Sequence, residues 1–189
     1  MSKQVEMRFA GSGGQGVILA SVILAEAAVI SGLQTVQSQA YGPEARGGVS
    51  KAETILSHDK IWFSKVQAPD FLLALTQASL KAYTKDLKSD AVIMMDDSLS
   101  LPAGIEASRV IAIPILRTAR ETVGKAFTAN IVAVGAINAA LQLFGADELM
   151  EAVSRHIPAG TEEINRKALE AGAALIDAET AERFGGRLG

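Results

Sequence analysis

Two kinds of apolar segment alternate along the chain, and their lengths predict different secondary structures. The short runs are rich in Val, Ile, Leu and Phe, which favours strands, and they lie at residues 5–10, 33–40, 49–56, 61–63, 71–75, 91–95 and 109–115. The longer segments have helical character and lie at residues 17–31, 77–87, 117–123, 127–144 and 147–184, the last broken near residues 158–160. Strands that alternate with helices predict a three-layer α/β/α domain with a mostly parallel sheet.

The stretch from residue 49 to residue 63 departs from this alternation, because two predicted strands follow each other with only residues 57–60 between them. Such a pair predicts a β-hairpin, which would add an antiparallel strand and make the sheet mixed. The sequence has no internal repeat, low-complexity tract or linker. We therefore expect a single domain that spans residues 1–189.

The charge balance excludes two classes of partner. The chain has 18 basic and 21 acidic residues, a net charge of −3, and 49% of its residues are apolar. This composition is typical of a folded protein without a basic surface, so we expect no nucleic-acid partner and no membrane partner. The apolar segment at residues 17–30 is shorter than the roughly 20 residues that a membrane span needs. No apolar signal segment precedes the first glycine loop, and the expected compartment is the cytoplasm.

The residues that usually carry redox or metal chemistry are scarce. Cysteine is absent, which excludes disulfides, thiolate catalysis, cysteine-ligated zinc and a cysteine-held iron–sulfur cluster in this chain. The two histidines, His58 and His156, lie far apart in sequence and have no acidic ligand at helical spacing beside them. No nucleophile, base and orienting group come together in the sequence. We therefore predict no catalytic residue and no metal site.

A glycine loop follows the first predicted strand and precedes the first predicted helix. Gly11, Gly13 and Gly16 match the pattern G-x-G-x-x-G, in which the backbone turns tightly and the free N–H groups at the helix start face an anion. The alternative is a tight turn that binds nothing. A dinucleotide site would also need an acidic residue near the end of the second strand, and residues 37–40 offer none. NAD binding is therefore disfavoured.

A second loop, at residues 41–48, is the less common feature. Small residues flank Arg46, so its guanidinium is open to a carboxylate or phosphate, and Tyr41 offers a flat face and a hydroxyl. The alternative is that Glu44 and Arg46 satisfy each other. We expect both loops to follow strands at the same edge of the sheet, which favours a ligand or interface role.

Three positions outside the loops need an interpretation as well. Asn130 lies in an apolar helix and must find a partner if it is buried, so a structural hydrogen bond is the first interpretation and ligand contact the second. Trp62 is expected to pack in the interior or to anchor an interface. The pair at residues 96–97, two aspartates after a strand, is expected to form a turn or cap a helix rather than bind a metal.

Four segments together resemble a known family. They read FAGSGGQGVILASVILAEAA, QAYGPEARGGVSKAETILS, PDFLLALTQASLKAY and TANIVAVGAINAAL. They are similar to the gamma subunit of 2-oxoacid:ferredoxin oxidoreductases, and to the 2-oxoglutarate type in particular. The resemblance is densest over residues 8–83 and covers most of the chain.

This resemblance implies the gamma-domain fold of pyruvate:ferredoxin oxidoreductase and a place in a multisubunit enzyme. Such an enzyme converts a 2-oxoacid and CoA to acyl-CoA and CO2 and reduces ferredoxin. Thiamine diphosphate, Mg and 4Fe–4S clusters are expected only in the thiamine-binding and iron–sulfur partner subunits, whereas this subunit contributes to assembly and to the CoA side of the site. The resemblance assigns the following residues as candidate cofactor or interface contacts: Gly11, Gly13, Gly14, Gln15, Gly16, Tyr41, Gly42, Pro43, Glu44, Arg46, Gly47 and Gly48.

Two alternatives stay open from the sequence. An indolepyruvate-type oxidoreductase beta subunit carries a similar domain, and the chain could also be a stand-alone nucleotide- or CoA-binding module. Adjacent genes for thiamine-binding and ferredoxin-like subunits would favour the oxidoreductase, and an isolated gene the module. In the oxidoreductase, the chain is expected to be inactive alone.

Overall fold

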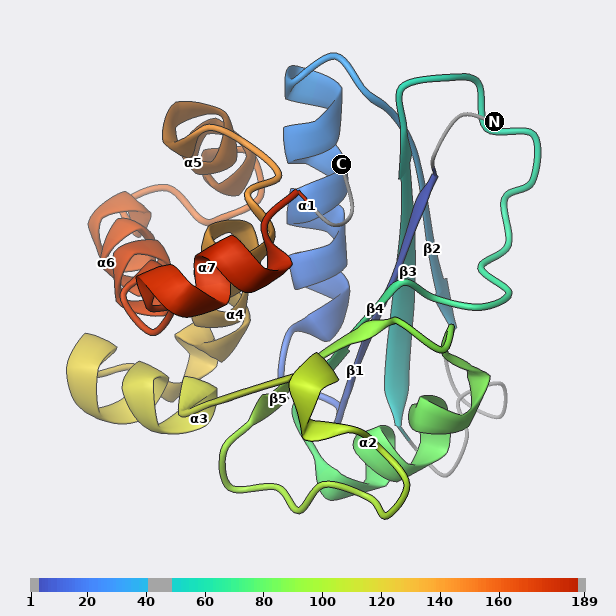
Figure 1. The fold of residues 1–189 in the computed structure, drawn as a ribbon. Coiled ribbons are helices and arrows are strands. Elements are labelled where there is room, and N and C mark those ends of the chain that lie inside the picture. Colours follow the sequence, from blue (N-terminus) through green and yellow to red (C-terminus); the bar gives the residue numbers. More distant parts are fainter. Residues whose placement is uncertain (1–3, 41–48, 187–189) are drawn as a thin grey trace.

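A six-stranded sheet forms the centre of the molecule in the computed structural model, which describes residues 4–40 and 49–186 (Figure 1). The strand order is β2-β3-β1-β4-β5-β6. The strands are β1 (Val5–Gly11), β2 (Gln34–Ala40), β3 (Ser50–Ser57), β4 (Phe71–Ala74), β5 (Val92–Asp96) and β6 (Val110–Ile113). β1, β4, β5 and β6 pair in parallel, whereas β3 is antiparallel to both β1 and β2. The predicted α/β fold with a mostly parallel, mixed sheet is confirmed.

The predicted hairpin is wrong. Residues 61–63 form no strand and lie in an irregular segment, residues 58–70, that connects β3 to β4. The residue types favour a strand, but β3 already pairs with β1 on one side and with β2 on the other. No edge of β3 is left for a hairpin partner, so the antiparallel pairing comes from strands that the local pattern could not identify.

The helices are α1 (Val17–Ile30), α2 (Gln77–Tyr83), α3 (Ile115–Thr118), α4 (Ala129–Leu141), α5 (Ala146–Ser154), α6 (Glu162–Ala173) and α7 (Ala178–Phe184). A π-helical turn, Ala119–Val123, continues α3, and short 3-10 turns precede α4 and follow α2. The predicted helical region 147–184 divides into three helices, with Thr161 at the N-cap of α6. None of the helices in the described part of the chain is long and apolar enough to cross a lipid bilayer.

The two faces of the sheet bury different partners, because successive side chains in a strand point to opposite sides. Phe9 and Leu73 belong to the larger core, which includes α1 and α4–α7 on the side that Figure 1 shows at the left. Leu72 and Met95 point the other way and pack with Leu80 of α2 in a smaller core. The helical layers are therefore unequal in thickness.

Helix α4 is buried along almost its whole length and packs against α1, α3, α6 and α7. Its backbone touches that of α6, where a Cβ on Gly172 would come within 2.0 Å of the Val132 carbonyl oxygen. This close crossing fixes the position of α4 and therefore of its first turn, which lies beside α1.

The ends of β1 and β2 lie at one edge of the sheet. Lys51 of β3 pairs with Ala10 near the end of β1 and with Ala40 at the end of β2. The two strands that precede the loops therefore end on the same side of the sheet, as the sequence predicted.

Candidate functional site

The loop between β1 and α1 has the backbone geometry of an anion-binding turn. Gly14 (φ 85°) and Gly16 (φ 70°) adopt the left-handed conformation, which favours glycine. Gly16 is the N-cap of α1, no side chain caps this helix there, and its first turn has no acidic residue. The first N–H groups of a helix have no partner within the helix, and its dipole is positive at this end. The start of α1 is therefore suited to a negatively charged group.

Gln15 holds this loop in shape. Its Oε1 accepts a hydrogen bond from the Ser12 N–H at 2.7 Å, and its Nε2 donates to the Leu75 carbonyl oxygen at 3.4 Å. Gly11 leaves room for this arrangement, since a Cβ there would lie 2.6 Å from the Gln15 Oε1. Gln15 and Gly11 therefore shape the loop, whereas the exposed Gly13 and Gly14 present its backbone to solvent.

A groove of about 450 Å³ runs beside the loop. Its polar part consists of Ser12, Gly14, Gly16 and Ser50. Its apolar part comes from the first turns of α1, through Val17, Ile18, Leu19 and Val22. The groove therefore suits a ligand that has both an anionic and an apolar portion.

Asn130 lies directly against the start of α1. Its Nδ2 is 2.6 Å from the position that a Cβ on Gly16 would occupy, and only 4% of the residue is exposed. The expected structural hydrogen bond is not found, since its side chain has no hydrogen bond with any residue in the ranges 4–40 and 49–186. The amide still reaches solvent, so its donor and acceptor groups are free to bind a ligand or a water.

Two helix N-termini meet at this contact. Asn130 lies in the first turn of α4, whose N-cap Thr128 makes no side-chain capping bond and whose first turn has no acidic residue, as in α1. The positive ends of two helix dipoles and a free amide therefore surround Gly16. The sequence pattern identified the glycine loop but not this partner, because the contact joins residues far apart in the chain.

The two carboxylates at the end of β5 have structural partners. Asp96 accepts hydrogen bonds from the Leu116 N–H at 2.7 Å and the Ser98 N–H at 3.2 Å, which confirms its turn and capping role. Asp97 forms an exposed ion pair with Arg117 at 3.1 Å. Within the described residues, no three histidines or acidic side chains come together in a group that could hold a metal ion.

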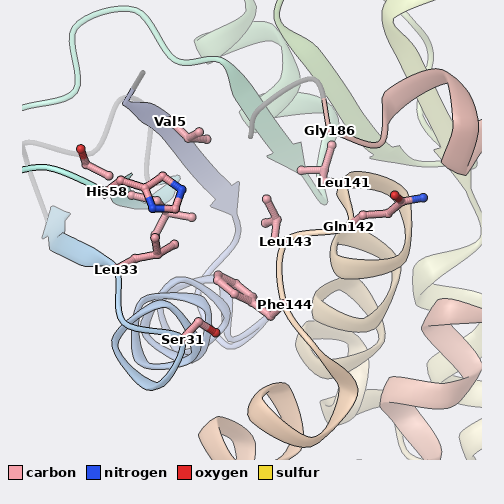
Figure 2. A pocket seen from close by; sticks show the side chains of 11 residues that line it. Val5, Ser31, Leu33, His58, Leu141, Gln142, Leu143, Phe144 and Gly186 are labelled. Carbon is pink, nitrogen blue, oxygen red and sulfur yellow. The ribbon is translucent and has the colours of Figure 1, made fainter. Parts of the chain in front are cut away.

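A cleft of about 210 Å³ lies at the opposite end of the sheet (Figure 2). Its lining is mostly apolar and includes Val5, Leu33 and Phe144, with His58 at its side. It lies where α1 and α4 end, so the helix dipoles present their negative ends to it. This cleft therefore disfavours an anion, and the edge with the glycine loop is the candidate site.

The second predicted cluster, Tyr41, Gly42, Pro43, Glu44, Arg46, Gly47 and Gly48, lies outside the described residues. It stays a prediction. What the structure does place is the end of β2, immediately before this loop, at the edge where the glycine loop lies.

Comparisons with known proteins agree with this fold. Residues 6–175 match the family described as pyruvate ferredoxin/flavodoxin oxidoreductase. The chain is 42% identical over 178 residues to the 2-oxoglutarate synthase subunit KorC of Methanothermobacter thermautotrophicus, which covers 90% of this chain and 94% of KorC. It is also 42% identical to the gamma subunit of a keto/oxoacid ferredoxin oxidoreductase from Geobacter sulfurreducens, with a TM-score of 0.82 over 91% of this chain and 95% of that one.

A third likeness concerns the fold alone. A chain of the 2-oxoglutarate:ferredoxin oxidoreductase from Magnetococcus marinus, solved with 2-oxoglutarate, coenzyme A and succinyl-CoA bound, is 23% identical with a TM-score of 0.80. The match covers 93% of this chain but only 31% of that longer one. The family match and the two 42% identities over nearly whole chains lead to one conclusion: this chain belongs to the pyruvate ferredoxin/flavodoxin oxidoreductase family.

Proposed function

We propose that this chain is the gamma subunit of a 2-oxoglutarate:ferredoxin oxidoreductase. The assembled enzyme would convert the 2-oxoacid and CoA to acyl-CoA and CO2 and pass the electrons to ferredoxin. The observation that carries this proposal is the 42% identity to the KorC subunit over almost the full length of both chains. An identity of that extent favours the 2-oxoglutarate type over the indolepyruvate type and over an independent binding module.

The chemistry of the reaction would be divided among subunits. This chain has no cysteine to hold a cluster. As the resemblance to this family implies, thiamine diphosphate, Mg and the 4Fe–4S clusters would reside in the partner subunits, and this subunit would contribute to assembly and to CoA binding. CoA supplies the thiol that accepts the acyl group.

The residues at the glycine loop fit the chemistry of CoA. Its phosphates would accept hydrogen bonds from the first N–H groups of α1 and from the Asn130 amide, near two positive helix ends. Its less polar portion would lie along Ile18, Leu19 and Val22, which line the same groove. Arg46 of the second loop would add a positive charge.

The first experiment is an affinity purification of this chain from its native cells under anaerobic conditions. The eluate is assayed for CoA-dependent reduction of a viologen dye with a panel of 2-oxoacids. We expect thiamine- and cluster-bearing subunits in stoichiometric amounts, and the highest activity with 2-oxoglutarate. A chain that elutes alone and inactive would contradict the proposal, and a preference for indolepyruvate would reassign the substrate.

The second experiment tests the site with Asn130→Asp, which keeps the size of the side chain but adds a negative charge beside the loop. We expect the KM for CoA to rise at least about tenfold, because a like charge replaces a hydrogen-bond donor, with an unchanged KM for the 2-oxoacid. Asn138→Asp is the matched control at the other end of α4, where the amide is already bonded to the backbone of Phe144. Equal effects of the two substitutions on the KM for CoA would refute the site.

A third experiment concerns the second loop, where Arg46→Ala is expected to lower CoA-dependent turnover without unfolding the subunit. Arginine binds phosphate through a charged, two-pronged contact, so its loss should matter most at limiting CoA. Unchanged turnover at limiting CoA would exclude Arg46 from the site.

A further inference from the structure

Two consecutive residues of the chain carry large aromatic side chains that are exposed to water. Trp62 is 79% exposed and Phe63 is 67% exposed, and both lie in the irregular segment 58–70. The interior packing considered for Trp62 is therefore not observed. Tryptophan and phenylalanine are enriched in the cores of protein interfaces, and tryptophan is prominent among residues that anchor them. We propose that Trp62 and Phe63 anchor this chain to a larger partner subunit of its oxidoreductase complex.

The segment that carries them is tied to the rest of the molecule. The Asp59 N–H donates to the Ser57 Oγ at 3.1 Å, and the Gln67 N–H donates to the Glu6 Oε2 at 3.2 Å. At the end of the segment, Asp70 accepts a hydrogen bond from the Glu6 N–H at 2.9 Å. The two aromatic rings are therefore presented by a segment fastened on both sides, which lowers the entropy lost on binding.

The position of the segment separates it from the candidate site. It begins after Ser57, and the neighbouring Leu56 pairs with Val5 at the start of β1, whereas the glycine loop begins at the other end of β1. A strand rises about 3.3 Å per residue, so β1 places its two ends about 20 Å apart. Figure 1 shows the segment on the side of the sheet away from α1 and α4–α7. A partner docked here leaves the glycine loop open.

The longer relative indicates which kind of partner fits. In the Magnetococcus marinus chain this fold makes up 31% of one polypeptide, so the larger remainder is joined to it covalently. Covalent linkage keeps two parts at high effective concentration. Where the gamma-type domain is a separate chain, side-chain contacts alone must hold the equivalent junction. Exposed aromatic anchors supply such contacts.

The charges near the rings favour another subunit over a second copy of this chain. Lys60 Nζ lies 4.3 Å from the centre of the Trp62 ring, and Lys65 follows Phe63 closely in the same exposed segment. A two-fold contact brings a surface against itself, so the positive charge of these lysines, which Asp59 offsets in part, would be repeated across the contact. The partner surface is instead an apolar hollow for an indole and a phenyl ring, edged by carboxylates. The identity of this partner rests on the proposed function.

The direct test replaces Phe63 with the photo-crosslinking residue p-benzoylphenylalanine in the assembled, anaerobically purified complex. After irradiation, mass spectrometry identifies the attached peptide, which we expect to come from the larger partner subunit. Phe127, which is 66% exposed between α3 and α4, is the matched control position and should not label that peptide. A cross-link to a second copy of this chain, or no cross-link in an active complex, would overturn the proposal.

Affinity gives the second measurement. Trp62→Ala should weaken binding of the purified partner subunit at least about tenfold, as expected for a tryptophan anchor, and Phe127→Ala less than about twofold. Turnover per assembled complex and the KM for CoA should not change in either variant. Unchanged affinity in Trp62→Ala together with normal 2-oxoacid oxidation would refute the docking surface and leave the proposed function intact. A complex without that oxidation would instead contradict the function.

Discussion

Three glycines of one loop differ in what a methyl group would meet, so Gly→Ala substitutions can separate backbone strain from crowding. Gly13 lacks a positive φ and has nothing within 4 Å of its Cβ position. Gly14 has a positive φ but the same open space. Gly16 has a positive φ and a Cβ position 2.6 Å from the Asn130 Nδ2 and 2.8 Å from its Cγ. We therefore expect a graded loss of stability from Gly13 to Gly16.

The expected changes in the free energy of unfolding follow from two contributions, the backbone strain of a positive φ and the crowding of the added Cβ. Gly13→Ala should change the free energy of unfolding by less than about 0.5 kcal/mol, or raise it slightly by restricting the unfolded chain. Gly14→Ala should lower it by about 1 kcal/mol, because an alanine pays about 1–2 kcal/mol in the left-handed region. Gly16→Ala adds crowding of about 1–3 kcal/mol to the backbone cost of about 1–2 kcal/mol, for a total loss of about 2–5 kcal/mol.

The assay is urea unfolding of the purified chain, followed by far-UV circular dichroism. In an Asn130→Ala background the two closest contacts disappear, so the cost of Gly16→Ala should fall to the backbone term of about 1–2 kcal/mol. If Gly16→Ala were as mild as Gly13→Ala, the contact between α1 and Asn130 would be refuted. If the cost of Gly16→Ala did not fall without the Asn130 amide, crowding against this side chain would not be its cause.

Three further predictions concern stability. Gly172→Ala should lower the free energy of unfolding by about 3 kcal/mol or more, since its Cβ would meet backbone atoms rather than a side chain that can move. A loss below about 1 kcal/mol in urea unfolding would contradict the close crossing of α4 and α6. Arg8→Met should lower the free energy of unfolding by about 2 kcal/mol, because the buried Glu53 loses the guanidinium bonded at 2.7 Å and keeps Lys51 at 3.1 Å. Replacing Glu53 by Leu as well should recover part of this loss, and no recovery would contradict the pairing. Hydrogen bonds from the side chain and backbone of Thr180 lower the pKa of Asp177. The ionised Asp177 therefore stabilises the fold at neutral pH. This stabilisation is lost as the pH falls from the ordinary carboxyl pKa of 3.8 through the lower pKa of the folded state. Melting temperatures measured across that acidic range should vary less with pH in Asp177→Asn, which still caps α7 but does not titrate.

The sequence predicted the elements whose signals are local. The apolar run before Gly11 and the long apolar segment after Gly16 gave β1 and α1 to within a residue or two. The hairpin failed because strand pairing is not local: the residues at 61–63 resemble a strand, but nothing in their own sequence shows that both sides of β3 are occupied. The mixed sheet was therefore predicted correctly, but the antiparallel partners of β3 are β1 and β2 rather than residues 61–63.

The candidate site was predictable to the same extent. The glycine pattern located the loop, since it depends on residues that are close in sequence. It could not distinguish Gln15, which closes the loop, from the glycines that expose its backbone. Asn130 carried a weak signal, a polar residue at the start of an apolar helix, but its contact with Gly16 requires the folding of α4 against α1.

Under the proposed function, this subunit would affect the reaction in two ways: it would place a ligand, and it would fix the position of a partner subunit that reacts with that ligand. The features proposed for these two roles lie at opposite ends of β1. The two helix starts and the Asn130 amide lie at one end, and the segment with Trp62 starts from the other. Residues more than about 10 Å apart that share no contacts act independently. Changes at the glycine loop should therefore alter CoA binding within an intact complex, whereas changes at Trp62 should alter how much complex forms and leave its chemistry unchanged.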